Sequence, residues 1–290
     1  MNKILSVPIW QWLVLLGVLL FAVVNLDSEA LNKAETSSVE AQLEEVLPED
    51  GIRLPVARGD LGKQLVDKGA IDGERFEKIY ESRGGLSEYE KALLYGEKND
   101  GLRIDRDNAG VVLNLLWAFG LANSNPVLEE GPMQNPEYGG ADQFASTGGW
   151  SLAKGDVMDH YSTYELISLT SEQQSLVEEV SKNIYRPCCG NSTYFPDCNH
   201  GMAMLGLLEL MASHGVSEDE MYKAALAANS YWFPDTYMTL AQYFEGEGTV
   251  WSDVDPKVAL GYDYSSGAGF RRILAEMEPV SVGGGGSCGV

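Results

Sequence analysis

The chain has 290 residues, of which 44% are hydrophobic, so it is long enough to build a core without cross-links. Lys and Arg number 20 against 43 Asp and Glu, and the formal net charge is −23 at pH 7. A surface this acidic repels phosphate backbones, so we expect no nucleic acid among the partners of this protein.

The N-terminal segment predicts a membrane helix. Residues 8–26 carry no formally charged side chain and have the length of a marginal membrane span. Lys3 precedes the segment and Asp27 follows it, and this places the amino end in the cytoplasm by the positive-inside tendency. We therefore expect residues 1–26 to be an uncleaved membrane anchor, with the domain facing the periplasm or the extracellular side. The alternative is a cleaved signal sequence, which would make the protein secreted.

The rest of the chain divides by composition. Residues 27–58 are rich in acidic side chains and predict a solvated tether. Residues 59–282 predict one extracytoplasmic helical domain. Residues 283–290 form a Gly-rich tail that carries Cys288, and we expect this tail to be flexible.

Helix signals recur throughout the predicted domain. Residues 107–122 are apolar nearly all round and predict a buried central helix. Capping boxes predict three further helix starts, at Ser87 and Glu90, Thr170 and Gln173, and Ser217 and Glu220. Since no stretch shows convincing period-two alternation, the predicted fold is all-α, a single bundle-like domain of two-helix units behind the N-terminal transmembrane helix.

One long segment interrupts the helical pattern. Residues 124–150 contain three prolines and five glycines and have no clear periodicity. A connection of this length inside a compact domain is usually a functional loop or a partner surface. We expect a protein partner to bind there, with Tyr138 and Trp150 as aromatic contacts.

The cysteines are concentrated in "CCGNSTYFPDCNHG", residues 188–201, which holds three of the four cysteines and one of the three histidines. Asp197 is the predicted N-cap of a buried helix that ends at Gly215. Cys198 would lie in the first turn of that helix, where free amides and the helix dipole stabilise a thiolate.

A soft-metal site is the leading interpretation of this block. Thiolates with imidazole suit Zn, and thiolates with thioether favour Cu. The protein would then be a membrane-anchored, extracytoplasmic metal-binding protein for metal handling or electron transfer. The predicted metal ligands are Cys188, Cys189, Cys198 and His200, with Met204 and the tail residue Cys288 as additional ligands.

Two other interpretations remain open. Four cysteines outside the cytoplasm allow three disulfide pairings, and a stapled helical domain would be an interaction scaffold that presents residues 124–150. A low-pKa thiolate at Cys198 would instead suit a thiol oxidoreductase, although the usual C-x-x-C spacing is missing. No hydrolase, P-loop or dinucleotide fingerprint assigns a catalytic residue.

A short stretch resembles the CDGSH iron–sulfur motif, C-x-C-x2-[ST]-x3-P-x-C-D-G-x-H. The matching positions are Cys189, Ser192, Pro196 and Cys198. The chain departs from the motif at both ends, because Cys188 adjoins Cys189 and because Asn-His-Gly follows Cys198. The resemblance implies an iron–sulfur cluster, which we keep as a minor option.

Overall fold

The computed structural model describes residues 39–97, 101–277 and 279–282, most of which are helical. Residues 39–44 are helical and belong to a first unit, Met1–Glu44. The second unit, Glu45–Val290, contains the following elements. Its helices are α2 (Leu61–Lys68), α3 (Gly73–Ile79), α4 (Glu88–Tyr95), α5 (Ala109–Ala122), α6 (Pro126–Glu129), α7 (Ser171–Asn183), α8 (Asn199–Ser213), α9 (Glu218–Trp232), α10 (Pro234–Gly246), α11 (Pro256–Ala259), α12 (Tyr262–Ser265) and α13 (Gly267–Ile273). Its strands are β1 (Ile52–Ala57) and β2 (Gly101–Ile104), and short 3-10 turns occupy parts of the connections.

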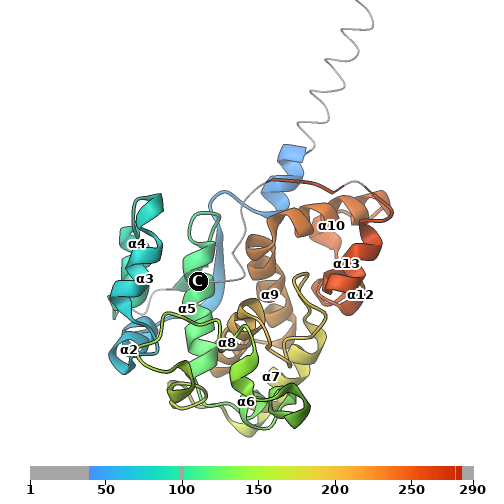
Figure 1. The fold of residues 1–290 in the computed structure, drawn as a ribbon. Helices are drawn as coiled ribbons and strands as arrows, with labels where there is room; N and C mark the ends of the chain where they lie inside the picture. Colours follow the sequence, from blue (N-terminus) through green and yellow to red (C-terminus); the bar gives the residue numbers. More distant parts are fainter. Residues whose placement is uncertain (1–38, 98–100, 278, 283–290) are drawn as a thin grey trace, which may run out of the picture. The chain divides into compact units, whose positions relative to one another are not determined.

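Helices α5 and α8 form the centre of the second unit (Figure 1). Both are buried along almost their whole length, as the all-apolar sequence of residues 107–122 predicts for α5. Their backbones approach closely at two glycines: a Cβ added at Gly120 would lie 3.2 Å from Gly206 Cα. The absence of side chains at these two positions is therefore what allows the two central helices to touch.

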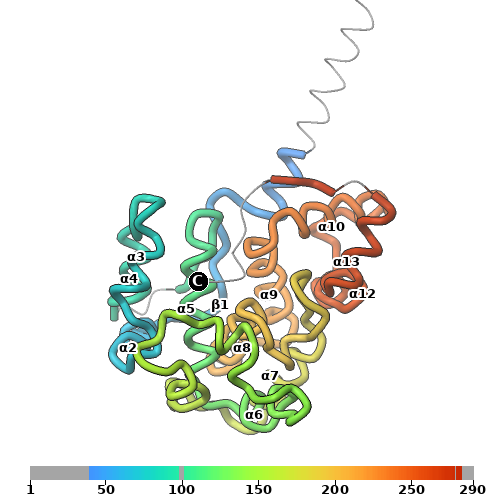
Figure 2. The backbone as a smooth tube through the Cα atoms, in the orientation of Figure 1, coloured from blue at the N-terminus to red at the C-terminus, as the bar shows by residue number. Residues whose placement is uncertain are grey.

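The remaining helices surround this pair. The backbone trace in Figure 2 shows α2, α3 and α4 on one side of α5, and α10, α12 and α13 on the opposite side of the unit, beyond α9. Helix α7 packs along α8, which places the α7–α8 connection at the start of α8. The mainly α-helical fold is thus confirmed.

Two strands correct the expectation of a fold without β-structure. Strands β1 and β2 pair antiparallel, with Ile52 opposite Ile104 and an irregularity between Arg53 and Ala57. In β1 the buried residues Leu54 and Val56 alternate with more exposed neighbours. This alternation extends over only six residues and includes a proline, so it was too short to stand out from the surrounding acidic segment.

The predicted helix starts are confirmed. The reciprocal side-chain-to-backbone hydrogen bonds of a capping box are present at the starts of α4, α7 and α9. These local signals were sufficient because each box satisfies amide groups that the helix itself leaves without partners.

Three predicted features lie outside the described residues. They are the anchor at 1–26, the first part of the tether at 27–38, and the tail at 283–290 with Cys288. Within the described ranges, no helix combines the length and the apolar character needed to cross a membrane.

Candidate metal centre

The α7–α8 connection carries Cys188 and Cys189 and is fixed by backbone hydrogen bonds. Tyr185 N–H donates to the Leu260 carbonyl oxygen at 2.8 Å. Gly267 N–H, at the start of α13, donates to the Cys189 carbonyl oxygen, also at 2.8 Å. Elements late in the chain therefore hold the cysteine loop in place over the start of α8.

Cys198, rather than Asp197, caps α8. Its backbone is extended (φ −124°, ψ 165°), and its Sγ accepts a hydrogen bond from Gly201 N–H at 3.4 Å. The Asp197 carboxylate instead accepts from Arg186 Nη2 at 2.5 Å. The prediction of Asp197 as the N-cap is therefore wrong, because this carboxylate pairs with a buried guanidinium.

Arg186 is the cation at the centre of this region, and its side chain is only 1% exposed. Its Nε–H donates to Cys198 Sγ at 3.0 Å, and its Nη1 donates to the Asn191 carbonyl oxygen at 3.0 Å. The guanidinium lies against Gly201, where an added Cβ would be 2.5 Å from Arg186 Cζ. Glycine at position 201 is thus required for the guanidinium to reach Cys198 and Asp197 together.

These contacts distribute charge unequally over the three sulfurs. Hydrogen bonds with the thiols of Cys188 and Cys189, aided by the Arg186 charge, hold the pKa of Cys198 well below its ordinary value despite burial. Hydrogen bonds with Cys189 and Cys198 raise the pKa of Cys188. The hydrogen bond with Cys188 lowers the pKa of Cys189, but Cys198 and burial outweigh it and the net change is upward. The surroundings therefore favour the thiolate form at Cys198 more than at Cys188 or Cys189.

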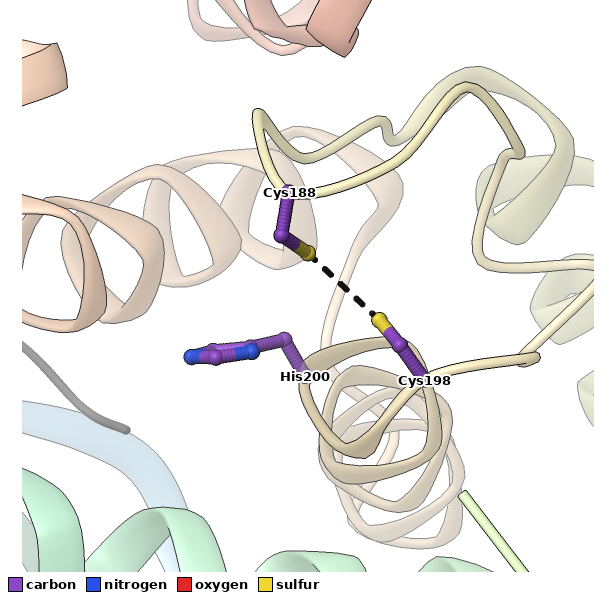
Figure 3. Close-up of side chains that lie close together, drawn as sticks. All are labelled: Cys188, Cys198 and His200. Atoms are coloured by element: carbon purple, nitrogen blue, oxygen red, sulfur yellow. Dashed lines mark hydrogen bonds between the residues drawn. The ribbon is translucent and has the colours of Figure 1, made fainter. Parts of the chain in front are cut away.

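Two groups of potential metal ligands share Cys198. The first comprises Cys188, Cys198 and His200, and the second comprises Cys189, Asp197 and Cys198; within each group the ligand atoms lie within 4.8 Å of one another. In the first group, Cys188 Sγ and Cys198 Sγ are 3.5 Å apart and turn toward each other from the loop and the helix start (Figure 3). The five side chains lie close enough to bind a metal ion, but neither group contains both Cys189 and His200.

His200 is fully buried, and neither of its ring nitrogens has a hydrogen-bond partner among the described residues. Its ring packs against the α9–α10 junction, with centroid distances of 4.3 Å to Phe233 and 6.0 Å to Trp232. The imidazole lies near the Cys198 sulfur without a hydrogen bond of normal geometry, and this contact is the smallest of the named effects that lower the pKa of Cys198. Buried polar groups in proteins are nearly always satisfied, so an unpartnered imidazole beside two sulfurs points to a ligand.

The second group already contains a cation, the Arg186 guanidinium. One oxygen of Asp197 accepts from Arg186, and the other accepts from Asn191 Nδ2 at 2.8 Å. Cys189 Sγ lies 3.9 Å from the Asn191 carbonyl oxygen. A metal ion here would have to displace the guanidinium, so the first group is the better candidate centre.

Two further ligands are predicted from the sequence, Met204 and Cys288. Met204 follows His200 by one turn of α8 and is buried in the core. Cys288 is not among the described residues, so both assignments remain predictions. The three described cysteines are free, so the disulfide-stapled interpretation receives no support from them.

The segment expected as a partner surface packs beside the cysteine loop. Tyr138 and Phe144 lie 5.3 Å from Phe195, between ring centroids, and Phe195 belongs to the α7–α8 connection. Tyr138 is 46% exposed, in agreement with a surface position.

Trp150, however, is not a surface residue. It is 3% exposed, and its ring N–H donates to the Ala70 carbonyl oxygen at 2.9 Å. Its ring lies 4.7 Å from that of Trp117, between centroids, in the core. The prediction of Trp150 as a partner contact is therefore wrong, because its large apolar surface is buried against α5.

Arg186 and Gly201 are the site residues that sequence reasoning missed. An arginine two positions before a cysteine pair offered a weak signal for charge compensation, but nothing local indicated that its side chain would be buried. The chain matches no family model, no curated protein and no solved structure. Its chemistry must therefore be inferred from the site.

Proposed function

We propose that this protein binds a soft transition-metal ion through Cys188, Cys198 and His200. The observation that supports the proposal is the fully buried His200, whose ring nitrogens have no partner among the described residues. Leaving a buried polar group unsatisfied costs about 1–3 kcal/mol, and coordination of the imidazole to a metal removes this penalty. Two sulfurs 3.5 Å apart supply the remaining soft ligands.

Cu(I) suits this set best. Two thiolates and one imidazole are soft ligands, whereas structural zinc sites are closed by four ligands. A fourth ligand, the thiolate of Cys288, would complete a tetrahedral set and favour zinc. An iron–sulfur cluster of the CDGSH type is less well supported, because Cys189 and His200 fall in different ligand groups.

The site is built for exchange rather than for permanent storage. Cys188 is exposed and on a loop, so an incoming donor or acceptor can replace its sulfur on the ion, while His200 and Cys198 hold the ion from the protein side. Cys188, whose pKa is raised, must release its proton on binding, whereas the lowered pKa of Cys198 favours its thiolate form. With residues 1–26 as a membrane anchor, the helical domain of two-helix units would handle metal at the extracytoplasmic surface.

A competition titration tests the proposal. Metal-free, full-length protein receives Cu(I) under anaerobic conditions in the presence of a coloured Cu(I) chelator. We expect the wild type to take one ion per chain, and Cys188→Ser, Cys198→Ser and His200→Leu to bind at least about tenfold more weakly. Cys189→Ser is the matched control, since it removes a thiol from the same loop but no member of the group formed by Cys188, Cys198 and His200.

Two results would contradict the assignment. One is a wild type that binds neither Cu(I) nor Zn(II). The other is a Cys189→Ser protein that loses as much affinity as His200→Leu. Deletion of residues 283–290 tests Cys288 separately: we expect unchanged stoichiometry with faster loss of the ion to the chelator, and unchanged release would remove Cys288 from the site.

A further inference from the structure

The sulfurs of Cys188 and Cys198 also have the geometry of a pair of thiols that can form a disulfide. Cys188 Sγ and Cys198 Sγ are 3.5 Å apart and face each other between loop and helix (Figure 3). A disulfide needs about 2.0 Å between sulfurs, so a small rotation of the exposed Cys188 side chain closes the gap. Cys189 Sγ lies within 4.8 Å of Cys198 Sγ and 3.9 Å from the Asn191 carbonyl oxygen. The contact between Cys188 Sγ and Cys198 Sγ, at 3.5 Å, is the one that we expect to close to a disulfide.

The two sulfurs of this pair have different surroundings. Cys188 is exposed, whereas Cys198 is partly covered at the start of α8. Cys198 Sγ accepts hydrogen bonds from Arg186 Nε–H at 3.0 Å and from Gly201 N–H at 3.4 Å. Donors aimed at a sulfur stabilise negative charge on it, and the sulfur that bears negative charge more readily is the better leaving group.

We propose that Cys188 and Cys198 alternate between a dithiol and a disulfide: a more oxidising disulfide compound accepts their two electrons by exchange, and the resulting Cys188–Cys198 disulfide oxidises substrate dithiols, with Cys188 as the attacked sulfur and Cys198 as the leaving sulfur. A substrate thiolate attacks the Sγ of the exposed residue Cys188, the Cys188–Cys198 bond breaks, and Cys198 leaves as a thiolate. The second thiolate of the substrate attacks the substrate sulfur of this mixed disulfide. Cys188 then leaves and takes up a proton. Two electrons pass from the substrate dithiol, an exposed cysteine pair of a peptide or protein, to the Cys188–Cys198 pair.

Arg186 is fixed in the position that this reaction needs. Its other nitrogens donate to the Asn191 carbonyl oxygen at 3.0 Å and to Asp197 at 2.5 Å, and Gly201 provides the space beside it. The donors therefore need not reorganise when Cys198 leaves. A stabilised leaving thiolate favours the reduced pair, which makes the disulfide form an oxidant.

This activity goes beyond metal binding and can fail independently of it. Both proposals use Cys188 and Cys198, but only metal binding uses His200. His200→Leu should therefore lose Cu(I) and keep disulfide exchange. Loss of exchange in a folded His200→Leu protein would contradict the redox proposal, and Cu(I) titration of the same sample reports on the metal proposal.

The experiment uses metal-free, full-length protein equilibrated with reduced and oxidised glutathione. Thiols are trapped by alkylation, and the disulfides are mapped by mass spectrometry. We expect a disulfide between Cys188 and Cys198 in the wild type and in Cys189→Ser, and a glutathione adduct on Cys188 at early times of reduction. A disulfide at Cys189 in the wild type, or an adduct on Cys198, would overturn the proposal without the need for any variant.

Two variants test the role of the donors. Arg186→Lys keeps a charge for Asp197 but removes the Nε–H donor. Gly201→Ala keeps Arg186 but displaces its guanidinium. Each should shift the equilibrium with glutathione about tenfold toward the protein disulfide, because the reduced pair loses a charge-assisted hydrogen bond. Circular dichroism verifies the fold, and an unchanged equilibrium in either folded variant would contradict the proposal.

Discussion

Glu209 shows how strongly burial can act on a single residue. This carboxyl group lies in the middle of α8 and is fully buried. Asn123 Nδ2 donates to its Oε2 at 2.6 Å, and Oε1 has no partner among the described residues. Burial raises the pKa of Glu209 to about 8, although hydrogen bonds with Asn123 and Asn125 act in the opposite direction. The folded protein therefore favours the protonated form of this residue.

The raised pKa predicts a stability that falls as the pH rises. The contribution of Glu209 to the free energy of unfolding is fully present below its ordinary pKa of 4.5 and is lost as the pH rises through about 8. Glu209→Gln should remove this loss and be more stable than the wild type at pH 9, by on the order of a few kcal/mol. Urea unfolding at pH 5 and pH 9 measures the difference. The exposed Glu247→Gln is the control, and a Glu209→Gln protein with the same pH dependence as that control would disprove the prediction.

The contact between α5 and α8 depends on small residues where the helices meet. A Cβ added at Gly206 would lie 2.7 Å from the Leu116 carbonyl oxygen and 2.9 Å from Gly120 N. These neighbours are backbone atoms, which cannot rotate away as the end of a side chain does. Helix α8, which Cys198 caps, therefore takes its position from backbone packing deep in the core.

Gly206→Ala should force the two central helices apart. We expect the free energy of unfolding to fall by about 1–3 kcal/mol, the usual cost of overpacking a core. Gly110→Ala is a matched control on α5, since an added Cβ there meets no atom within 4 Å. Replacing glycine with alanine in a helix is otherwise favourable, so the control should keep or slightly raise stability. Equal effects of the two changes on chemical denaturation would refute the close-contact interpretation.

The net charge of −23 is a property of the whole molecule, and it affects which charged reactants approach the cysteines. A strongly negative surface lowers the local concentration of anions and raises that of cations. Salt weakens this effect, because the screening length falls to about 10 Å at 0.1 M ionic strength. A positively charged metal donor or a basic polypeptide would therefore be attracted to the protein at low salt.

Alkylation rates test this long-range effect at the exposed Cys188. Iodoacetate is an anion and iodoacetamide is neutral. The ratio of the iodoacetate rate to the iodoacetamide rate should therefore be lower for the protein than for a short peptide that contains the same cysteine. The relative rate should rise toward the peptide value as salt increases. The Cys189→Ser protein has fewer competing thiols. If its ratio of the two alkylation rates does not change with salt, the net charge has no effect on the reaction at Cys188.

Much of the fold could be predicted because its signals are local. The capping boxes at the starts of α4, α7 and α9 and the apolar sequence of α5 each specify a helix from neighbouring residues alone. The strands were missed because β1 and β2 are short and pair across about fifty residues. Trp150 was misassigned because a loop residue gives no local sign of burial against a distant helix.

The candidate site was predictable in its cysteines and His200, but not in their arrangement. Their closeness in sequence brought together Cys188, Cys198 and His200, which form one ligand group. The hydrogen bond of Arg186 with Cys198 depends on the burial of that arginine, which needs Gly201 and the contacts of the folded loop. Such a role could not be read from the sequence, because arginines are usually exposed.

Cys198 is at once the cap of α8 and the sulfur that binds metal or forms a disulfide in our proposals. By reciprocity, anything that draws electron density from this sulfur weakens its hydrogen bond to the Gly201 amide and loosens the first turn of α8. Conversely, a tighter first turn favours the free thiolate. The Gly201 amide proton therefore serves as a built-in spectroscopic reporter, because its exchange rate with solvent and its chemical shift change with the state of the sulfur three residues before it.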